Sequence, residues 1–161
     1  ATALLWGSEE TGFQGMVVLD NFTLFLTLVI GYATGLVLLL SIDYLQRLGM
    51  ESGEFYILVL FAATGMVVMA GANDLIVVFL GLETMSLALY VLSASLRERK
   101  TSIEAGAKYF LTGAFASGIL LMGIALVYGA TGRLSLPLIA QGGAADTDWD
   151  KTVASLTSLI G

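Results

Sequence analysis

The chain has 161 residues, of which 57% are apolar and only 12% are charged. Soluble domains are about 45–50% apolar and about 25% charged, so a mean hydropathy of +0.89 excludes a water-soluble enzyme. Seven basic against thirteen acidic residues leave a formal net charge of −6, which excludes nucleic acid as a partner. The sequence has no cysteine and no histidine, so we expect no disulfide, no iron–sulfur cluster and no metal site of the usual zinc or haem type.

The two ends of the sequence are unusual. Residues 1–20 have no basic region and hold three acids, so we expect no secretory signal there. The apolar run after Lys151 stops after ten residues, which is too short to span a membrane. We therefore expect a piece of a longer protein, with the start of a further helix at 152–161.

Four long runs with almost no charge are each expected to form a membrane-spanning helix. A helix rises about 1.5 Å per residue, so about 20 apolar residues cross a hydrocarbon core of about 30 Å. In lipid, backbone polar groups must be satisfied within the segment, which favours helix even in runs rich in Val and Ile. The sequence thus predicts an all-α integral membrane protein, a single membrane domain with a bundle of four transmembrane helices. The expected spans are 21–44, 54–72, 74–96 and 103–129, followed by a polar outer loop at 130–151.

Side chains at the span ends resemble helix caps. Asn73 is a good N-cap candidate for the third span, and Asp74 either caps that helix or begins it, where an acid complements the helix dipole. A hydroxyl residue at 101–102 followed by Glu104 resembles a capping box. This pattern places the start of the fourth span near residue 103.

Small residues and methionines predict packing faces. Gly31 and Gly35 form a GxxxG pattern in the first span, and the fourth span is rich in Gly, Ala and Ser between 113 and 123. Such stretches let helix backbones approach closely. We expect the methionines and the scattered Phe and Tyr residues to pack rather than to bind a cofactor. The methionines concerned are Met66, Met69 and Met85.

The basic residues predict an orientation. Four of them lie on the side that holds the connections after the first and third spans, against two beside seven acids on the other side. The positive-inside rule places the first side in the cytoplasm. The four are Arg47, Arg97, Arg99 and Lys100, and the two are Arg133 and Lys151.

Glu83 is the one ionisable residue in the middle of a span. It lies eight residues into the third span, roughly 12 Å deep, where an ionisable group costs a few kcal/mol and is a functional candidate. The alternative is a protonated Glu83 that only hydrogen-bonds a neighbouring helix. The residues three and four positions away include no base, so its partner must come from another helix, from water or from a bound proton. Those residues are Phe79, Leu80, Ser86 and Leu87.

Lys108 is the second candidate. Counted from residue 103, it lies about five residues, roughly 7–8 Å, inside the fourth helix. At that depth a lysine can reach the lipid headgroups, or it can pair at the surface with Glu104 one turn earlier. Its depth differs from that of Glu83 by roughly 12 Å, so we expect no direct contact between the two.

Two long stretches then point to a known family. They read GEFYILVLFAATGMVVMAGANDLIVVFLGLETMSLALYVL and AGAKYFLTGAFASGILLMGIALVYGATG. Together with residues 15–45, they closely resemble the antiporter-like subunit N family of proton-pumping NADH:quinone oxidoreductase (respiratory complex I), over about residues 15–135. Members of that family are 14-helix proteins, and the four spans resemble their helices 3 to 6. Glu83 matches the helix-5 glutamate and Lys108 the helix-6 lysine of the hydrophilic axis that moves protons.

The resemblance implies a function. It implies a membrane subunit of a proton-translocating NADH:quinone oxidoreductase, with Glu83 and Lys108 as the catalytic residues of proton translocation and no redox centre on this chain. NADH, FMN, iron–sulfur clusters and quinone would be bound by partner subunits. The alternative is a subunit of a multi-subunit Na⁺/H⁺ antiporter, while a purely structural membrane protein would leave Glu83 unexplained. We expect a hetero-oligomer with other membrane subunits of complex I in the lipid bilayer. Its expected location is the bacterial plasma (inner) membrane, as a multi-pass protein, rather than the mitochondrial inner membrane.

Overall fold

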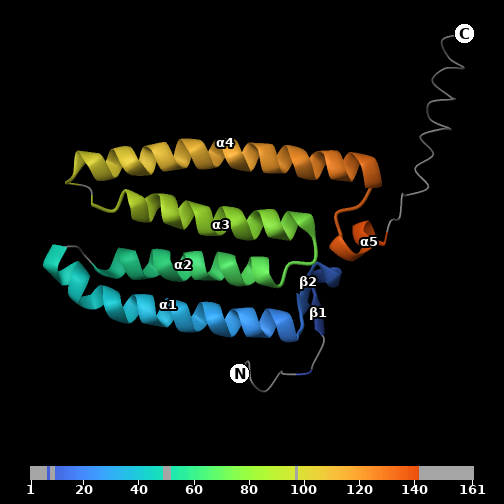
Figure 1. Ribbon diagram of the computed structural model, residues 1–161, viewed down its shortest axis with the longest axis horizontal. Helices are drawn as coiled ribbons and strands as arrows, with labels where there is room; N and C mark the ends of the chain where they lie inside the picture. The colour runs from blue at the N-terminus through green and yellow to red at the C-terminus, as the bar shows by residue number, and fades with distance from the viewer. Residues whose placement is uncertain (1–6, 8–9, 49–51, 97, 142–161) are drawn as a thin grey trace, which may run out of the picture.

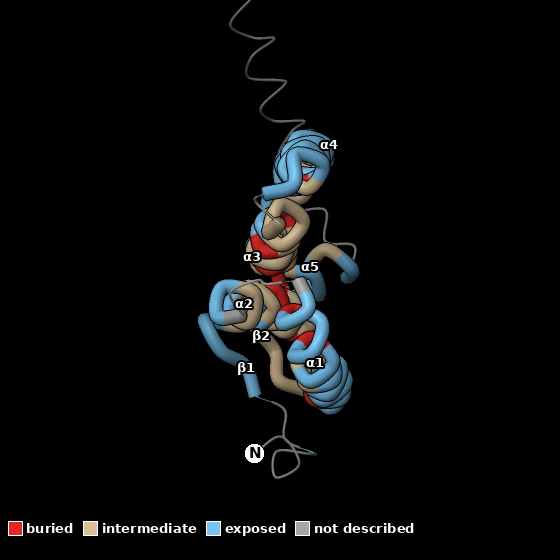
Figure 2. The backbone as a smooth tube through the Cα atoms, turned by 90° about the vertical axis from the view of Figure 1, so that its left-hand side faces the viewer, coloured by how far each residue is buried: buried red, intermediate tan, exposed pale blue. Residues whose placement is uncertain are grey.

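The computed structural model describes residue 7 and residues 10–48, 52–96 and 98–141. Long helices lie side by side in chain order, each antiparallel to the next (Figure 1). Seen along their axes they stand in a row, with the first and the last at the two edges (Figure 2). All four are long and apolar enough to cross a membrane. They are α1 (Asn21–Leu48), α2 (Ser52–Ala70), α3 (Leu75–Ser93) and α4 (Lys100–Thr131).

The prediction of four long apolar helices is confirmed, with shifted ends. The largest shift is at the end of α1, which runs to Leu48 rather than to residue 44, and α4 begins at Lys100 rather than near residue 103. The predicted capping box is wrong, because its side chains bind elsewhere. The Ser102 hydroxyl donates to the carbonyl of Ser93 (2.8 Å), and the Glu104 carboxylate pairs with a lysine one turn later. Arg99 takes the N-cap position with an extended backbone and no side-chain cap.

A small hairpin precedes α1, and no pattern in the sequence predicts this hairpin. Strand β1 (Glu10–Gly12) pairs antiparallel with strand β2 (Val17–Leu19), and the 3-10 turn η2 (Phe13–Gly15) joins them. The turn is left-handed, with φ of 59° at Gln14 and 86° at Gly15. Strands of three residues carry too little alternation to be seen in the sequence.

The turn between α2 and α3 holds this hairpin against the bundle. The Val18 N–H donates to the carbonyl of Gly71 (2.9 Å), and the side-chain amide of Asn73 donates to the carbonyl of Gly15 (2.9 Å). Asn73 is therefore not the N-cap of α3, since its side chain binds the hairpin. A Cβ at residue 71 would lie 3.2 Å from the carbonyl oxygen of Val18, so a side chain there would require its neighbours to shift by a few tenths of an ångström.

The segment after α4 returns to the other side of the same turn. The Leu75 N–H donates to the carbonyl of Leu134 (3.0 Å), and the Leu136 N–H donates to the carbonyl of Asn73 (2.9 Å). A short helix follows, α5 (Leu136–Ala140), so the expected polar loop at 130–151 contains a helical turn. A proline in its first turn favours that start because its φ is already helical. The expected further helix at 152–161 lies outside the described residues.

Two aspartates satisfy the backbone at helix starts. Asp74 is the N-cap of α3, as expected, and accepts a hydrogen bond from the Ile76 N–H (2.9 Å). Asp20, just before α1, accepts from the Thr23 N–H (2.7 Å). That backbone hydrogen bond, and then the Thr23 hydroxyl, lower the pKa of Asp20 below its ordinary value of 3.8.

The tightest helix contact joins α2 and α3 through two glycines. A Cβ at Gly65 would lie 2.6 Å from the carbonyl oxygen of Gly81, and a Cβ at Gly81 would lie 2.9 Å from the backbone nitrogen of Met69. Only glycine lets two helix backbones come this close. By contrast, nothing lies within 4 Å of the Cβ positions of Gly31 and Gly35. The GxxxG pattern of α1 therefore packs against no described part of the chain.

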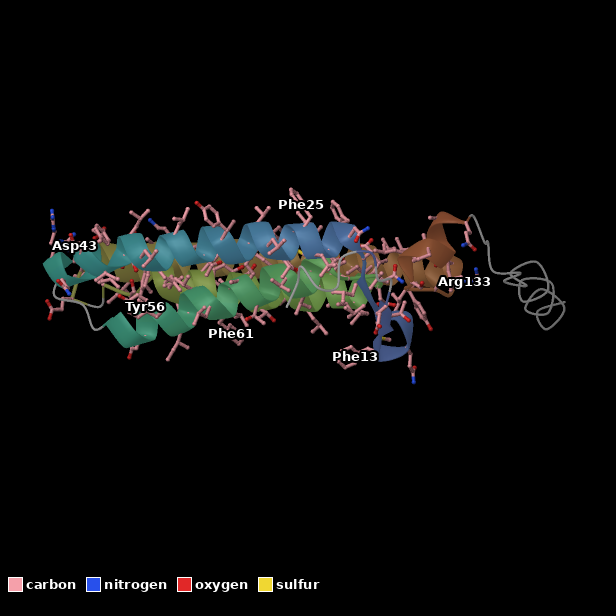
Figure 3. All side chains as sticks on the ribbon, turned by 90° about the horizontal axis from the view of Figure 1, so that it is seen from below. Phe13, Phe25, Asp43, Tyr56, Phe61 and Arg133 are labelled. Carbon is pink, nitrogen blue, oxygen red and sulfur yellow. The ribbon has the colours of Figure 1, made fainter. Side chains whose placement is uncertain are left out.

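Most apolar side chains lie on the outside of this row. Leu40 is 76% exposed and Phe115 is 73% exposed. Phe25 and Phe61 project outward from the helices (Figure 3). A surface this apolar is unstable in water and suits lipid or neighbouring membrane helices.

Candidate functional site

The position of Glu83 follows from the two contact faces of α3. Gly81 packs on α2, whereas Tyr90 and Ala94 contact α4 at Gly113 and Gly106. Tyr90 and Ala94 come seven and eleven residues after Glu83, close to two and three helical turns. Glu83 therefore lies on the face of α3 that is turned toward α4.

One carboxyl oxygen of Glu83 is buried without a partner. This oxygen, Oε1, is shielded from solvent and has no hydrogen bond from any described residue. The neighbouring hydroxyl of Thr84 donates to the carbonyl of Leu80 instead (2.8 Å). A buried polar atom without a partner is destabilising and rare in native proteins. The Glu83 carboxyl thus requires a bound proton, a water molecule or a partner beyond the described segment.

Tyr90 is a buried aromatic residue on the same face of α3 as Glu83. It is 8% exposed, and its ring stands edge-on to Tyr109 and Phe110 of α4, with ring centroids 4.9 and 5.7 Å away. Each such pair stabilises by about 0.5–1.5 kcal/mol beyond the burial of area. The Tyr90 hydroxyl lies directly against Gly113, where any Cβ would collide with it. The sequence predicts only packing for Tyr90, although its spacing from Glu83 places both residues on one face of the helix.

Lys108 lies on a different face of α4 from the residues that contact α3. Its ammonium pairs with the Glu104 carboxylate at 2.6 Å, and these side chains are 74% and 63% exposed. Lys108 follows the α3-facing Gly106 by two residues, a rotation of about 200°, so it is directed away from α3. Because α4 begins early, Lys108 lies eight residues, about 12 Å, from the start of the helix rather than the expected five.

The structure does not bring Glu83 and Lys108 together. Their difference in depth can be counted from two α3–α4 contacts, Ser93–Ser102 and Ala94–Gly106. Counted from the first contact, Glu83 and Lys108 differ in depth by four residues, and counted from the second contact they differ by nine. These differences correspond to roughly 6 to 14 Å, a range that includes the expected difference of roughly 12 Å. With Lys108 on the far side of α4, any link between the two must run through groups outside the described segment. In residues 7, 10–48, 52–96 and 98–141, no group of His, Cys, Asp or Glu could hold a metal ion.

Comparison with known proteins decides the family. The family model described as NADH:quinone oxidoreductase/Mrp antiporter, transmembrane, matches residues 72–161, more than half of the chain. The chain belongs to this family. The family resemblance expected from the sequence is therefore confirmed.

The relatives of the chain include bacterial complex I subunits. Subunit N 2 of the NADH-quinone oxidoreductase of Roseiflexus castenholzii is 48% identical over 137 residues, which are 85% of this chain and 28% of that protein. Subunit N of Trichlorobacter lovleyi is 46% identical over 147 residues, 88% of this chain and 30% of that protein. The chain thus spans less than a third of the length of these curated relatives.

A solved structure supports the fold. Respiratory complex I from Thermus thermophilus with bound aureothin contains a chain that matches with a TM-score of 0.66 and 37% sequence identity. The match covers 84% of this chain and 29% of that one. The row of four helices therefore matches part of a chain of respiratory complex I, which confirms the fold expected from the resemblance.

Proposed function

We propose that the chain is part of an N-type membrane subunit of an NADH:quinone oxidoreductase and takes part in proton translocation. The observation that carries this proposal is the unpartnered Glu83 oxygen, held inside a membrane-spanning helix on the face toward α4. Ionisable groups at such depth are costly and mark ion or proton pathways. The similarity to subunit N supplies the process that the site serves.

Glu83 is the proton-holding group in this mechanism. A carboxyl group away from opposite charge keeps its proton in a medium of low dielectric constant, and an approaching cation makes it release that proton. No base faces Glu83 from the described residues, so the cation that drives release belongs to the rest of the subunit or to its neighbours. In this mechanism, partner subunits bind NADH, FMN, iron–sulfur clusters and quinone. A signal from those subunits moves the cation that drives proton release from Glu83.

Lys108 acts on the other side of α4. Glu104 holds its ammonium in an ion pair well inside the helix, and we assign Lys108 the relay or modulation of protons toward the cytoplasmic side. The face that carries it is open in the described chain. Lys108 therefore works with groups outside this segment rather than with Glu83 directly.

The proposed setting is a hetero-oligomer with other membrane subunits of complex I. The relatives named above are bacterial, which supports a multi-pass subunit of the bacterial plasma membrane.

A second candidate function is Na⁺/H⁺ antiport, because the family description also includes Mrp antiporters. The names of the relatives favour the first candidate. The two differ in what drives proton movement. Membranes carrying the full-length subunit should pump protons with NADH, without a requirement for Na⁺, if the first candidate is right.

The test is substitution of Glu83 in the full-length subunit, assembled in its complex. Glu83→Gln keeps the shape and removes the titration, so the complex should assemble and lose most of its proton pumping per quinone reduced. Glu83→Asp should keep part of it. Pumping and quinone-reductase rates are measured in membrane vesicles and normalised to assembled complex. Glu98→Gln, the same change on the exposed α3–α4 connection, is the matched control and should pump normally. A fully coupled Glu83→Gln complex would refute the proposal.

A further inference from the structure

The unpartnered Glu83 oxygen and the Tyr90 hydroxyl lie on one face of α3. Both residues are directed toward α4, seven residues apart, and one oxygen of the Glu83 carboxyl lacks a hydrogen bond from the described chain. Side chains in a helix lean toward its N-terminus. From Tyr90, that direction leads back along α3 toward Glu83.

The contact with Gly113 fixes how far back the hydroxyl reaches. The pairing of Ser93 with Ser102 places Gly113, eleven residues further along α4, at the level of residue 82 of α3. The contact of Ala94 with Gly106 places it at the level of residue 87. Glu83 falls within this interval, so the Tyr90 hydroxyl lies within about one helical turn in depth of the backbone position of Glu83.

The hydroxyl is held there by the packing of its ring. Tyr109 and Phe110 both meet the Tyr90 ring edge-on, which leaves it little freedom to turn. The site at Gly113 is open only because glycine has no side chain. These contacts hold the hydroxyl of Tyr90 within the contact between α3 and α4.

We propose that Tyr90 is a positioning residue for proton transfer at Glu83, with its hydroxyl linked to the Glu83 carboxyl through one water molecule. A phenol can donate to a carboxylate and accept from a protonated carboxyl, so it orients Glu83 in both protonation states. The inference rests on the proposed function of Glu83.

The first experiment uses Tyr90→Phe in the full-length subunit within its complex. Phenylalanine keeps the ring contacts and removes only the hydroxyl, so assembly should be normal. Proton pumping per quinone reduced should fall several-fold. The infrared band of the Glu83 carboxyl, identified as the band that Glu83→Gln abolishes, should shift in Tyr90→Phe. Unchanged pumping would overturn the proposal whatever the band does. A loss of pumping with an unshifted band would also overturn it, since it would indicate a purely structural role.

A second pair of variants tests the same point from α4. Gly113→Ala displaces the hydroxyl, whereas Gly118→Ala, on the same helix with nothing within 4 Å, is the matched control. Gly113→Ala should reduce pumping as Tyr90→Phe does. The variant that combines both changes should pump no less than either single variant. Equal pumping by the two alanine variants would contradict the proposal. If Glu83→Gln pumps normally, the proposed function fails; if only the Tyr90 and Gly113 variants pump normally, this inference fails alone.

Discussion

The free energy of the ion pair on α4 depends on whether water, lipid or protein surrounds it. Lys108 and Glu104 are joined at 2.6 Å and largely exposed in the described chain, and an exposed pair of this kind stabilises by only about 0.3–0.5 kcal/mol. In a membrane, a pair whose lysine lies eight residues inside a helix cannot face lipid without a large cost in free energy. Either the two side chains extend to the headgroups, or protein covers this face of α4.

A double-mutant cycle in the full-length subunit tests whether Lys108 takes part in proton movement or the pair only anchors the helix. If Lys108 takes part in proton movement, Lys108→Met should lower pumping several-fold, while Glu104→Gln, which leaves the charge of Lys108, should lower it less than twofold. If the pair only anchors the helix, both variants and the double variant should pump alike. Pumping is measured in vesicles per assembled complex. Equal rates in all three would contradict a role of Lys108 in the pathway.

Single residues were predictable where type and position alone decide their role. Glu83 is conspicuous because it is an acid in an apolar run, and Asp74 because it precedes such a run. The role of Tyr90 depends on what α4 places opposite it, which no local pattern contains. The partner of Ser102 was not predictable, because its hydroxyl can bind either its own helix start or another segment. The carbonyl of Ser93, which it binds, is brought close only in the folded chain.

At the scale of elements, the α2–α3 contact allows a direct test. In the full-length subunit, Gly65→Ala should destabilise this contact by about 1–3 kcal/mol, as is usual for overpacking, because the new Cβ would lie 2.6 Å from the backbone of α3. Gly31→Ala in α1 is the matched control and should be neutral within the chain, since nothing lies near its Cβ. The measurement is the midpoint of thermal unfolding of the purified subunit. A Gly65→Ala subunit as stable as Gly31→Ala would contradict the close approach.

The long helices were predictable because lipid forces apolar runs of about 20 residues into helix. The hairpin and α5 were not, because their strands and turns are held by backbone hydrogen bonds to the α2–α3 turn rather than by a pattern of their own. The glycines of α1 were predicted to pack, but no described element covers them. A GxxxG pattern indicates that a helix can be approached closely and does not say by what.

Hydrogen bonds between segments join the described chain at one end of the helix row. Hairpin, α2–α3 turn and the segment after α4 are joined by backbone hydrogen bonds at the end of the row near Arg133, while Asp43 lies at the opposite end (Figure 3). The C-terminal end of α1 and the N-terminal end of α4 lie at that second end. The second end is the one where the basic residues gather.

This arrangement predicts the side on which each end labels. In a cysteine-free full-length subunit, cysteines replacing Glu98 and Asp43 should react with a membrane-impermeant thiol reagent only in inside-out vesicles. A cysteine replacing Gln141, beyond α5, should react only in right-side-out vesicles. The reason is the excess of basic residues at the end that holds positions 43 and 98, which the positive-inside rule assigns to the cytoplasm. Because α4 crosses the membrane between positions 98 and 141, labelling of both from the same side would contradict the four-span fold. Opposite labelling in the reverse sense would contradict only the orientation, and would place the Lys108 end of α4 on the outer side.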